Sequence, residues 1–330
     1  RKVTVDSSKI IKQSFESRGF SKEVSQVMLA ARKPATREQY GVYIKAWYAY
    51  CSQKRVSKTR ASVSQGLNFM EETRQLRSLS YSSVNVMRSA LSSVIAPFKG
   101  TTFGDHADTV TYMKGVFNES PKVPKYQEIW DLNVVLDYLK KVGPAHKLPL
   151  KSLTLKTVTL LMIVTGQRAQ TLSLLDLQNC QVSQNQILFV ITENVKTSKP
   201  GTGAVQLKLQ KYVPDQRLCV VRYVKEYIKR TKAVRASSQL FISYQKPHQA
   251  VLKGTIAHWI KLVLKLSGIN TEIFQGHSVR SASCSKASRQ GVQLNVILKQ
   301  GGWRSASTFQ KYYNKPLSQA ENVFAKSVLS

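Results

Sequence analysis

Several features are scarce in this chain of 330 residues, and each scarcity excludes a class of protein. The four cysteines lie far apart, at Cys51, Cys180, Cys219 and Cys284, and no CxxC pair occurs. This spacing argues against a structural zinc site and a disulfide framework, and it favours reduced thiols in an intracellular protein. No apolar run approaches the roughly 20 residues that a membrane-spanning helix needs.

Acidic residues are also scarce. The chain has 18 Asp and Glu against 50 Lys and Arg, so its net charge is +32 and its isoelectric point is about 10.1. Such an excess of one sign repels itself unless a polyanion compensates it, and nucleic acid is the first candidate because each neutralised phosphate releases counterions. The basic residues are spread along the chain instead of forming a tail. An anionic membrane surface or a ribosomal type of RNA binding are the alternative interpretations.

The length predicts two domains. In the first part, apolar residues recur at helical spacing, which predicts four helices. They are expected over 34–52, around 63–70, over 81–96 and around 110–117. We therefore predict a helical bundle over 1–120 and, from Pro121 and Pro124, a linker over 121–127.

The remainder, 128–330, predicts a mostly helical domain with a small β-hairpin, so the fold class is mainly α. Two β-rich segments, 187–192 and 204–209, flank a tip with the sequence ENVKTSKPGTG. A short amphipathic helix is expected at the end, over 318–328. The other helices are expected over 131–141, 153–165, 215–231, 255–266, from 277, over 293–299 and around 309–312.

Two arginines have the chemistry that a phosphate site needs. Cleavage of a phosphodiester without a metal requires a nucleophile, cations that hold the phosphate oxygens, and an acid for the leaving oxygen. Arg168 follows a helix that reads as buried, so it needs an anionic partner, whereas most other arginines here are typical of a surface. Arg280 comes three residues after His277, on the same helix face.

Four further residues are weak indications when taken alone. A lone His277 is typical of a packed or surface residue, and Trp303 after two glycines is typical of a core. Tyr312 is one of 14 tyrosines, and Lys196 at the hairpin tip is typical of a solvated loop, although a lysine there can reach a cleft and act as an acid.

The order of these residues resembles the tyrosine recombinase superfamily, which includes phage integrases and Cre. TGQR at 165–168, HSVR at 277–280 and GGW at 301–303 resemble its motifs, and the nine-residue step after Trp303 favours Tyr312 over the adjacent Tyr313. KTSKPG at 196–201 resembles the hairpin lysine motif of eukaryotic mobile-element recombinases of the DIRS, Ngaro and Crypton kind, with Lys196 as the acid and Lys199 as the fallback. The first 120 residues resemble their core-binding domain.

This resemblance implies a site-specific DNA recombinase or transposase. Tyr312 would form a 3′-phosphotyrosyl bond, Arg168 and Arg280 would hold the phosphate with His277 and Trp303, and Lys196 would protonate the leaving oxygen. No metal, ATP or other cofactor is implied. The implied partner is double-stranded DNA, bound by a homotetramer joined through the C-terminal helix around Phe324, and the implied location is the nucleus for a eukaryotic mobile element or otherwise the nucleoid or cytoplasm.

One position departs from the family pattern. Thr171 stands three residues after Arg168, where the family usually carries an acidic residue, and Asp176 is a distant substitute. This departure favours one alternative, a domesticated DNA-binding protein with weak catalysis. A second alternative is an enzyme like the type IB topoisomerases, which share this chemistry but act as monomers. A general RNA binder would explain the charge but not the order of the motifs.

Overall fold

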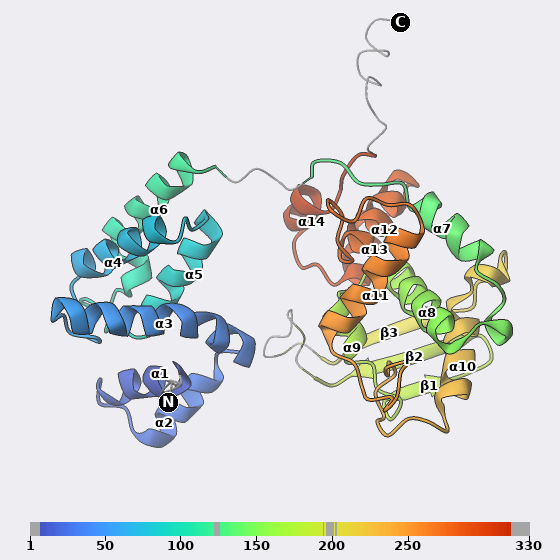
Figure 1. Ribbon diagram of the computed structural model, residues 1–330, viewed down its shortest axis with the longest axis horizontal. Helices are drawn as coiled ribbons and strands as arrows, with labels where there is room; N and C mark the ends of the chain where they lie inside the picture. The colour runs from blue at the N-terminus through green and yellow to red at the C-terminus, as the bar shows by residue number, and fades with distance from the viewer. Residues whose placement is uncertain (1–6, 122–125, 194, 196–200, 202, 318–330) are drawn as a thin grey trace, which may run out of the picture. The chain divides into compact units, whose positions relative to one another are not determined.

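The computed structural model describes residues 7–121, 126–193, 195, 201 and 203–317, and they divide into two compact units, 1–123 and 124–330 (Figure 1). Most of the predicted linker, at 122–125, lies outside the described residues, as does the predicted tail helix 318–328. No helix in the described ranges is long and apolar enough to cross a membrane.

The first unit is a helical bundle with more helices than the sequence predicts. The four expected helices are present as α3 to α6, although the third ends at Leu91 and not at residue 96. Two earlier helices, α1 and α2, were not predicted. The elements are α1 Ser7–Glu16, α2 Lys22–Ala30, α3 Pro34–Lys54, α4 Val63–Leu76, α5 Tyr81–Leu91, the 3₁₀ turn η1 Phe103–Asp105, and α6 Ala107–Glu119.

The core of the first unit forms around α3. Ile44, Trp47 and Cys51 recur on one face of this helix and are buried, as their spacing predicts. Trp47 packs edge-on against Phe69 of α4, with 5.1 Å between ring centres, and its Nε1 donates to the carbonyl oxygen of Lys58 at 2.9 Å. The indole therefore buries its rings without leaving a polar atom unpaired.

The second unit is mainly helical and contains one three-stranded antiparallel sheet in the order β1-β2-β3. The predicted hairpin is confirmed, because β2 pairs with β3 and Phe189 faces Leu207. The elements are α7 Leu132–Lys141, η2 Ala145–Lys147, α8 Leu150–Thr165, α9 Ala169–Ser173, β1 Cys180–Val182, β2 Gln186–Ile191, β3 Val205–Gln210, η3 Gln216–Leu218, α10 Val220–Thr231, α11 Lys253–Leu266, α12 Ser278–Arg289, α13 Leu294–Gly301 and α14 Ala306–Tyr312.

Helix α8 runs through the centre of this unit, in contact with α10, α11, α12 and β3 (Figure 1). Apolar residues lie on all sides of this helix, and Thr157, Thr159 and Thr165 donate their hydroxyls to carbonyl oxygens one turn earlier. The helix ends at Thr165 and is capped by Gly166, which adopts the left-handed conformation with φ +57°. The chain therefore turns sharply just before Arg168.

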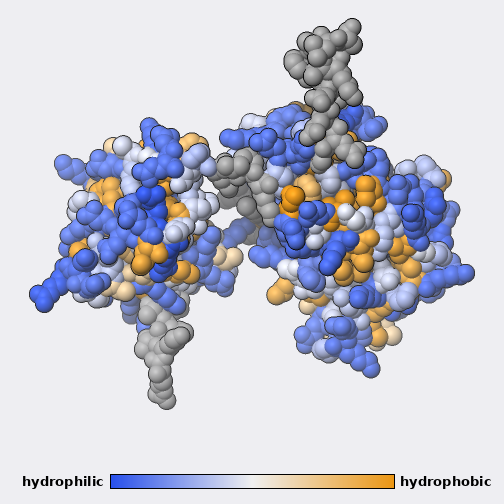
Figure 2. Space-filling model, turned by 45° about the horizontal axis from the view of Figure 1, so that its top comes forward, coloured by the Kyte–Doolittle hydropathy of each residue, from blue (hydrophilic) through white to orange (hydrophobic). Residues whose placement is uncertain are grey.

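The first and the last described segments of the second unit are joined by hydrogen bonds. Ile129 N donates to the carbonyl oxygen of Pro316 at 2.8 Å, and Trp130 Nε1 donates to Ser278 Oγ at 2.9 Å. These bonds tie the segment after α14 and the start of α12 to the beginning of the unit. On the face that Figure 2 shows, hydrophobic side chains are interspersed among hydrophilic ones.

Candidate active site

Arg280 is a buried cation with unused hydrogen-bond donors. It lies on α12, and 2% of its surface is exposed. Its Nη1 donates to the carbonyl oxygen of Gly301 at 2.7 Å and to that of Gly166. Its Nε and Nη2 are buried and have no acceptor among the described residues. Because a buried charge without a counterion destabilises the folded state, this guanidinium is suited to bind an anion.

The two carbonyl oxygens that hold Arg280 come from glycines that permit close packing. A Cβ on Gly301 would lie 2.0 Å from the ring of Trp303, so only glycine lets the indole lie there. A Cβ on Gly166 would lie 3.0 Å from Cys284 Sγ, at a residue whose φ of +57° already favours glycine. Gly166 and Gly301 therefore shape the pocket around the guanidinium.

Arg168 is the N-cap residue of α9, and its side chain is half-buried. It lines a cavity of about 670 Å³ together with Thr171, Lys208 and Lys299, and no Asp or Glu belongs to the described lining. Burial lowers the pKa of Arg280, and the positive charge of Arg168 lowers that pKa further. The guanidinium stays protonated at neutral pH. The two arginines thus concentrate positive charge without a carboxylate between them in the described structure.

Trp303 covers the guanidinium of Arg280. The indole is 7% exposed, and its ring centre lies 3.6 Å from Arg280 Cζ, in stacking contact. Its Nε1 is buried and has no acceptor among the described residues. The structure therefore brings Arg280 and Trp303 together, with three unpaired donor atoms between them.

The two tyrosines at the end of α14 lie differently. Tyr312 is the last residue of the helix and is 57% exposed. Tyr313 is half-buried, and its ring centre lies 4.8 Å from that of Trp303 and 5.2 Å from Arg280 Cζ. The described structure thus places Tyr313 beside Arg280.

The remaining predicted residues have different settings. His277 is the exposed N-cap residue of α12, one turn before buried Arg280. Lys196 and its fallback Lys199 lie outside the described residues. The carboxylate of Asp176 accepts from Gln178 N at 2.7 Å and from Ser238 Oγ at 2.8 Å, and it forms no ion pair with Arg168 in the described structure.

Sequence reasoning missed the residues that fix this arrangement. Ser281 and Ser285, one turn apart on α12, both donate to the carbonyl oxygen of Tyr313, at 2.9 and 2.6 Å. Gln167 Nε2 donates to the carbonyl oxygen of Gln300 at 2.7 Å. In the sequence, the signal that could have indicated these bonds is the pair of serines spaced four residues apart directly after Arg280, because such a pair lies on one helix face.

Comparisons with known proteins show which family and which fold this chain resembles. Residues 135–318 match the model of the phage integrase family, and this range contains every described residue of the site. A search of curated proteins found no match.

Solved structures of similar fold cover nearly the whole chain. The XerH site-specific recombinase bound to difH substrate has a TM-score of 0.62 at 11% identity, with 98% of each chain covered. The Tn1549 transposon integrase in complex with transposon right end DNA has a TM-score of 0.56 at 11% identity, covering 99% of this chain and 100% of that one. A lambda integrase dimer bound to a COC′ core site has a TM-score of 0.52 at 15% identity, covering 90% and 95%. At these identities the likeness is one of fold, that of the tyrosine recombinases.

Proposed function

Because this chain belongs to the phage integrase family, we propose that it is a site-specific tyrosine recombinase that cleaves and rejoins double-stranded DNA. The observation that carries the proposal is the buried guanidinium of Arg280, with Nε and Nη2 unpaired among the described residues. A phosphodiester supplies both the negative charge and the oxygen acceptors that these donors lack. The net charge of +32 supports DNA as the source of that phosphate.

In the proposed reaction, Arg280 and Arg168 bind the non-bridging oxygens of the scissile phosphate, and Trp303 Nε1 donates a further hydrogen bond. His277 completes the phosphate site at the start of α12. Tyr312 attacks phosphorus, and Lys196 gives its proton to the departing 5′ oxygen. Neither metal nor ATP takes part, because the phosphotyrosyl bond conserves the free energy that rejoining needs.

The test uses a library of random duplexes that each carry a single nick. When cleavage occurs beside a nick, the short 5′-hydroxyl fragment diffuses away and the protein stays covalently attached. Wild-type protein should give adducts that resist denaturation, and sequencing of the trapped DNA identifies the target. Arg280→Met should reduce adduct formation by roughly 100- to 1000-fold, on the scale of losing a donor to a transition-state oxyanion.

Arg222→Met is the matched control, because Arg222 is an exposed arginine on α10, whereas Arg280 is buried. It should form adducts as the wild type does. DNA binding without adducts in the wild type would instead support the domesticated DNA-binding protein, which the absence of a carboxylate at Thr171 favours. Failure to bind DNA at all would contradict both proposals.

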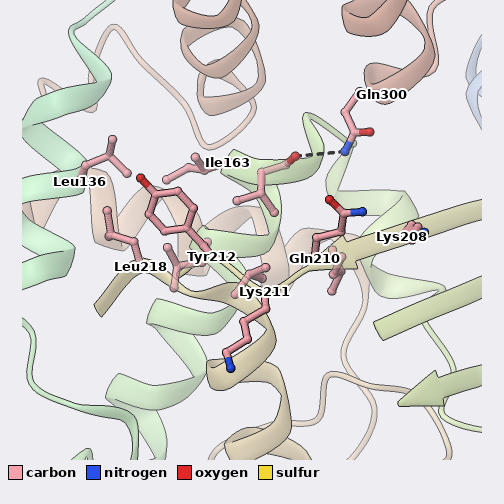
Figure 3. A pocket seen from close by; sticks show the side chains of 12 residues that line it. Leu136, Ile163, Lys208, Gln210, Lys211, Tyr212, Leu218 and Gln300 are labelled. Atoms are coloured by element: carbon pink, nitrogen blue, oxygen red, sulfur yellow. Dashed lines mark hydrogen bonds between the residues drawn. The ribbon is translucent and has the colours of Figure 1, made fainter. Parts of the chain in front are cut away.

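We also propose that the protein works as a tetramer in which the tail 318–328 of one subunit binds a neighbouring subunit. A groove of about 620 Å³ in the second unit offers a mainly apolar receptor, lined by Leu136, Ile163, Tyr212 and Leu218 among others (Figure 3). The apolar residues of the tail, among them Phe324, fit such a lining. A kinship with DIRS, Ngaro or Crypton recombinases, and with it a nuclear location, remains part of this proposal.

Deletion of residues 318–330 should reduce the mass of DNA-bound complexes in a sizing experiment while each subunit still binds DNA. Leu136→Arg in the groove should have the same effect, because it places a charge in an apolar receptor. Leu266→Arg is the control, since Leu266 lies outside the groove and is 53% exposed. Unchanged assembly in both the deletion and Leu136→Arg would refute the receptor.

A further inference from the structure

Helix α12 presents a row of three hydrogen-bond donors to the segment that follows α14. Ser281, Ser285 and Arg289 are four residues apart, so their side chains lie on one face of the helix. Arg280 directly precedes this row and points about 100° away from Ser281, toward carbonyl oxygens at the ends of α8 and α13. The same helix therefore carries the buried guanidinium of the candidate site and, on another face, the row of donors.

The row binds the backbone directly after α14. The hydroxyls of Ser281 and Ser285 donate to the carbonyl oxygen of Tyr313, at 2.9 and 2.6 Å. Arg289 Nη1 donates to the carbonyl oxygen of Lys315 at 3.1 Å, and Lys315 N donates to Ser285 Oγ at 3.0 Å. Ser281 is 2% exposed and Ser285 is 0% exposed, so water does not compete for the bonds of the serines.

Helix α14 depends on such an anchor. It has seven residues, of which Phe309 is the buried one, and a helix of fewer than about 12 residues is not stable on its own in water. The last carbonyl groups of a helix also have no partner within the helix, so they need donors from elsewhere. Ser281 and Ser285 provide two such donors at the residue that caps α14, which is Tyr313.

The anchor lies one residue from Tyr312. Because 57% of Tyr312 is exposed, the packing around its ring does not fix its place, and its backbone must do so. Consecutive Cα atoms are about 3.8 Å apart, so bonds that hold Tyr313 also restrict where the Tyr312 backbone can lie. The ring of Tyr313 adds a side-chain contact, since its centre lies 4.8 Å from that of Trp303.

We propose that Ser281 and Ser285 are positioning residues, which set the distance between Tyr312 and a phosphate held by Arg280. This inference rests on the proposed recombinase function. Because the serines and Arg280 belong to one helix, the nucleophile segment and the phosphate site share a rigid support. A displacement of about 1 Å at a reacting group can slow a reaction roughly 100-fold, so the two hydroxyls act on rate and not on affinity.

Alanine variants test this role in single-turnover adduct formation, at saturating protein, with a nicked duplex selected from the random library. Ser281→Ala and Ser285→Ala should each lower the rate roughly 2- to 12-fold, the effect of one hydrogen bond. The double variant should lower it roughly 10- to 100-fold. DNA affinity should stay within about twofold of the wild type, because a serine carries no charge.

Ser283→Ala is the matched control. Ser283 lies on the same helix, but its hydroxyl donates to the carbonyl oxygen of Val279 at 2.9 Å, within α12. Its removal makes the same chemical change without touching the segment after α14. Ser283→Ala should keep the wild-type rate and affinity.

A second pair of variants separates the hydroxyl from the packing around it. Ser281→Thr and Ser281→Val place side chains of nearly the same shape at a buried position, so any strain from the added methyl group is common to both. The threonine alone keeps a donor for Tyr313. At a temperature well below the melting point of either variant, Ser281→Thr should form adducts roughly 2- to 12-fold faster than Ser281→Val.

The outcomes separate this role from the function on which it rests. Wild-type rates in the double alanine variant, equal rates for Ser281→Thr and Ser281→Val, or an affinity loss as large as the rate loss would each overturn the positioning role. The recombinase function would then stand. Absence of adducts from the wild type itself contradicts the proposed function, and the positioning role falls with it.

Discussion

Gln167 and Gln300 form a reciprocal clamp between the end of α8 and the end of α13. Gln167 Nε2 donates to the carbonyl oxygen of Gln300 at 2.7 Å, while Gln300 Nε2 donates to the carbonyl oxygen of Val164 at 3.1 Å. Gln167 directly precedes Arg168, and Gln300 comes just before the Gly-Gly-Trp turn. The clamp therefore fixes the position of Arg168 relative to the indole that covers Arg280.

Replacing Gln167 by leucine should slow covalent adduct formation. The change keeps the volume of the side chain and removes its bond to Gln300, which is worth about 0.5–1.5 kcal/mol, so the rate should fall roughly 2- to 12-fold. Affinity for DNA should change less, because Gln167 carries no charge. Single-turnover rates at saturating protein, measured beside DNA affinity, separate positioning from binding.

The control for this prediction is Gln178→Leu, which makes the same chemical change at an exposed loop position. It should leave the rate unchanged. Equal rates for Gln167→Leu and wild type, or an affinity loss as large as the rate loss, would mean that the clamp does not position Arg168.

Thr171 offers a gain-of-function test. It lies one turn after Arg168, lines the same cavity and is 4% exposed. In Thr171→Asp, a carboxylate three residues from the arginine can pair with it and hold its guanidinium in one orientation. We expect adduct formation to become severalfold faster. Thr171→Asn is the near-isosteric control without charge, and equal rates for the two variants would show that the missing carboxylate is not limiting.

Lys299 should contribute to DNA binding through charge alone. It lies near the end of α13 and lines the cavity with Arg168, where no described carboxylate competes for it. Each phosphate that a lysine neutralises contributes about 0.9 to the slope of log affinity against log salt concentration. Lys299→Gln should lower that slope by roughly one unit. Lys232→Gln, at the exposed end of α10, is the control and should keep the wild-type slope.

A helix could be predicted where its own sequence repeats apolar residues at helical spacing. Helix α3 repeats Ile44, Trp47 and Cys51 at helical spacing, and the structure buries these residues. Helix α1 was not predicted although Ile11 and Phe15 lie one turn apart, because its ten residues carry only three large apolar side chains, Ile10, Ile11 and Phe15, which pack in the core of the bundle. Strand β1 has three mostly exposed residues and is defined by its pairing with β2.

The sequence predicts which residue types belong to the candidate site, but it does not predict the hydrogen bonds that connect them. Arg280 and Trp303 could be chosen from their motifs. Two hydrogen bonds could not be predicted from the sequence. One joins Arg280 Nη1 to the carbonyl oxygen of Gly166, 114 residues away, and the other joins Gln167 Nε2 to the carbonyl oxygen of Gln300, 133 residues away. Local periodicity carries no information on such distant contacts, which the packing of α8, α12 and α13 creates.

A stability prediction concerns Lys156, a lysine of α8 that is 1% exposed. Its Nζ donates to the carbonyl oxygen of Val142 at 2.7 Å and lies 4.4 Å from the ring centre of Tyr223. Burial lowers the pKa of Lys156 from 10.5 to about 8, although the charge of Asp215 raises it in part. Between these two pKa values the unfolded chain binds more protons than the folded one at this site. The contribution of Lys156 to the free energy of unfolding therefore rises with pH from about 8 to about 10.

Lys156→Met isolates this effect, since it removes the titrating group and keeps most of the apolar chain. The difference in unfolding free energy, wild type minus variant, should rise by on the order of 1–3 kcal/mol between pH 7 and pH 10, measured by denaturant unfolding. Other groups that titrate in this range, such as the cysteines, cancel in the difference. Lys151→Met, at an exposed position of the same helix, should give a difference that does not depend on pH. A flat difference for Lys156→Met as well would mean that the buried amine keeps the pKa of an ordinary lysine.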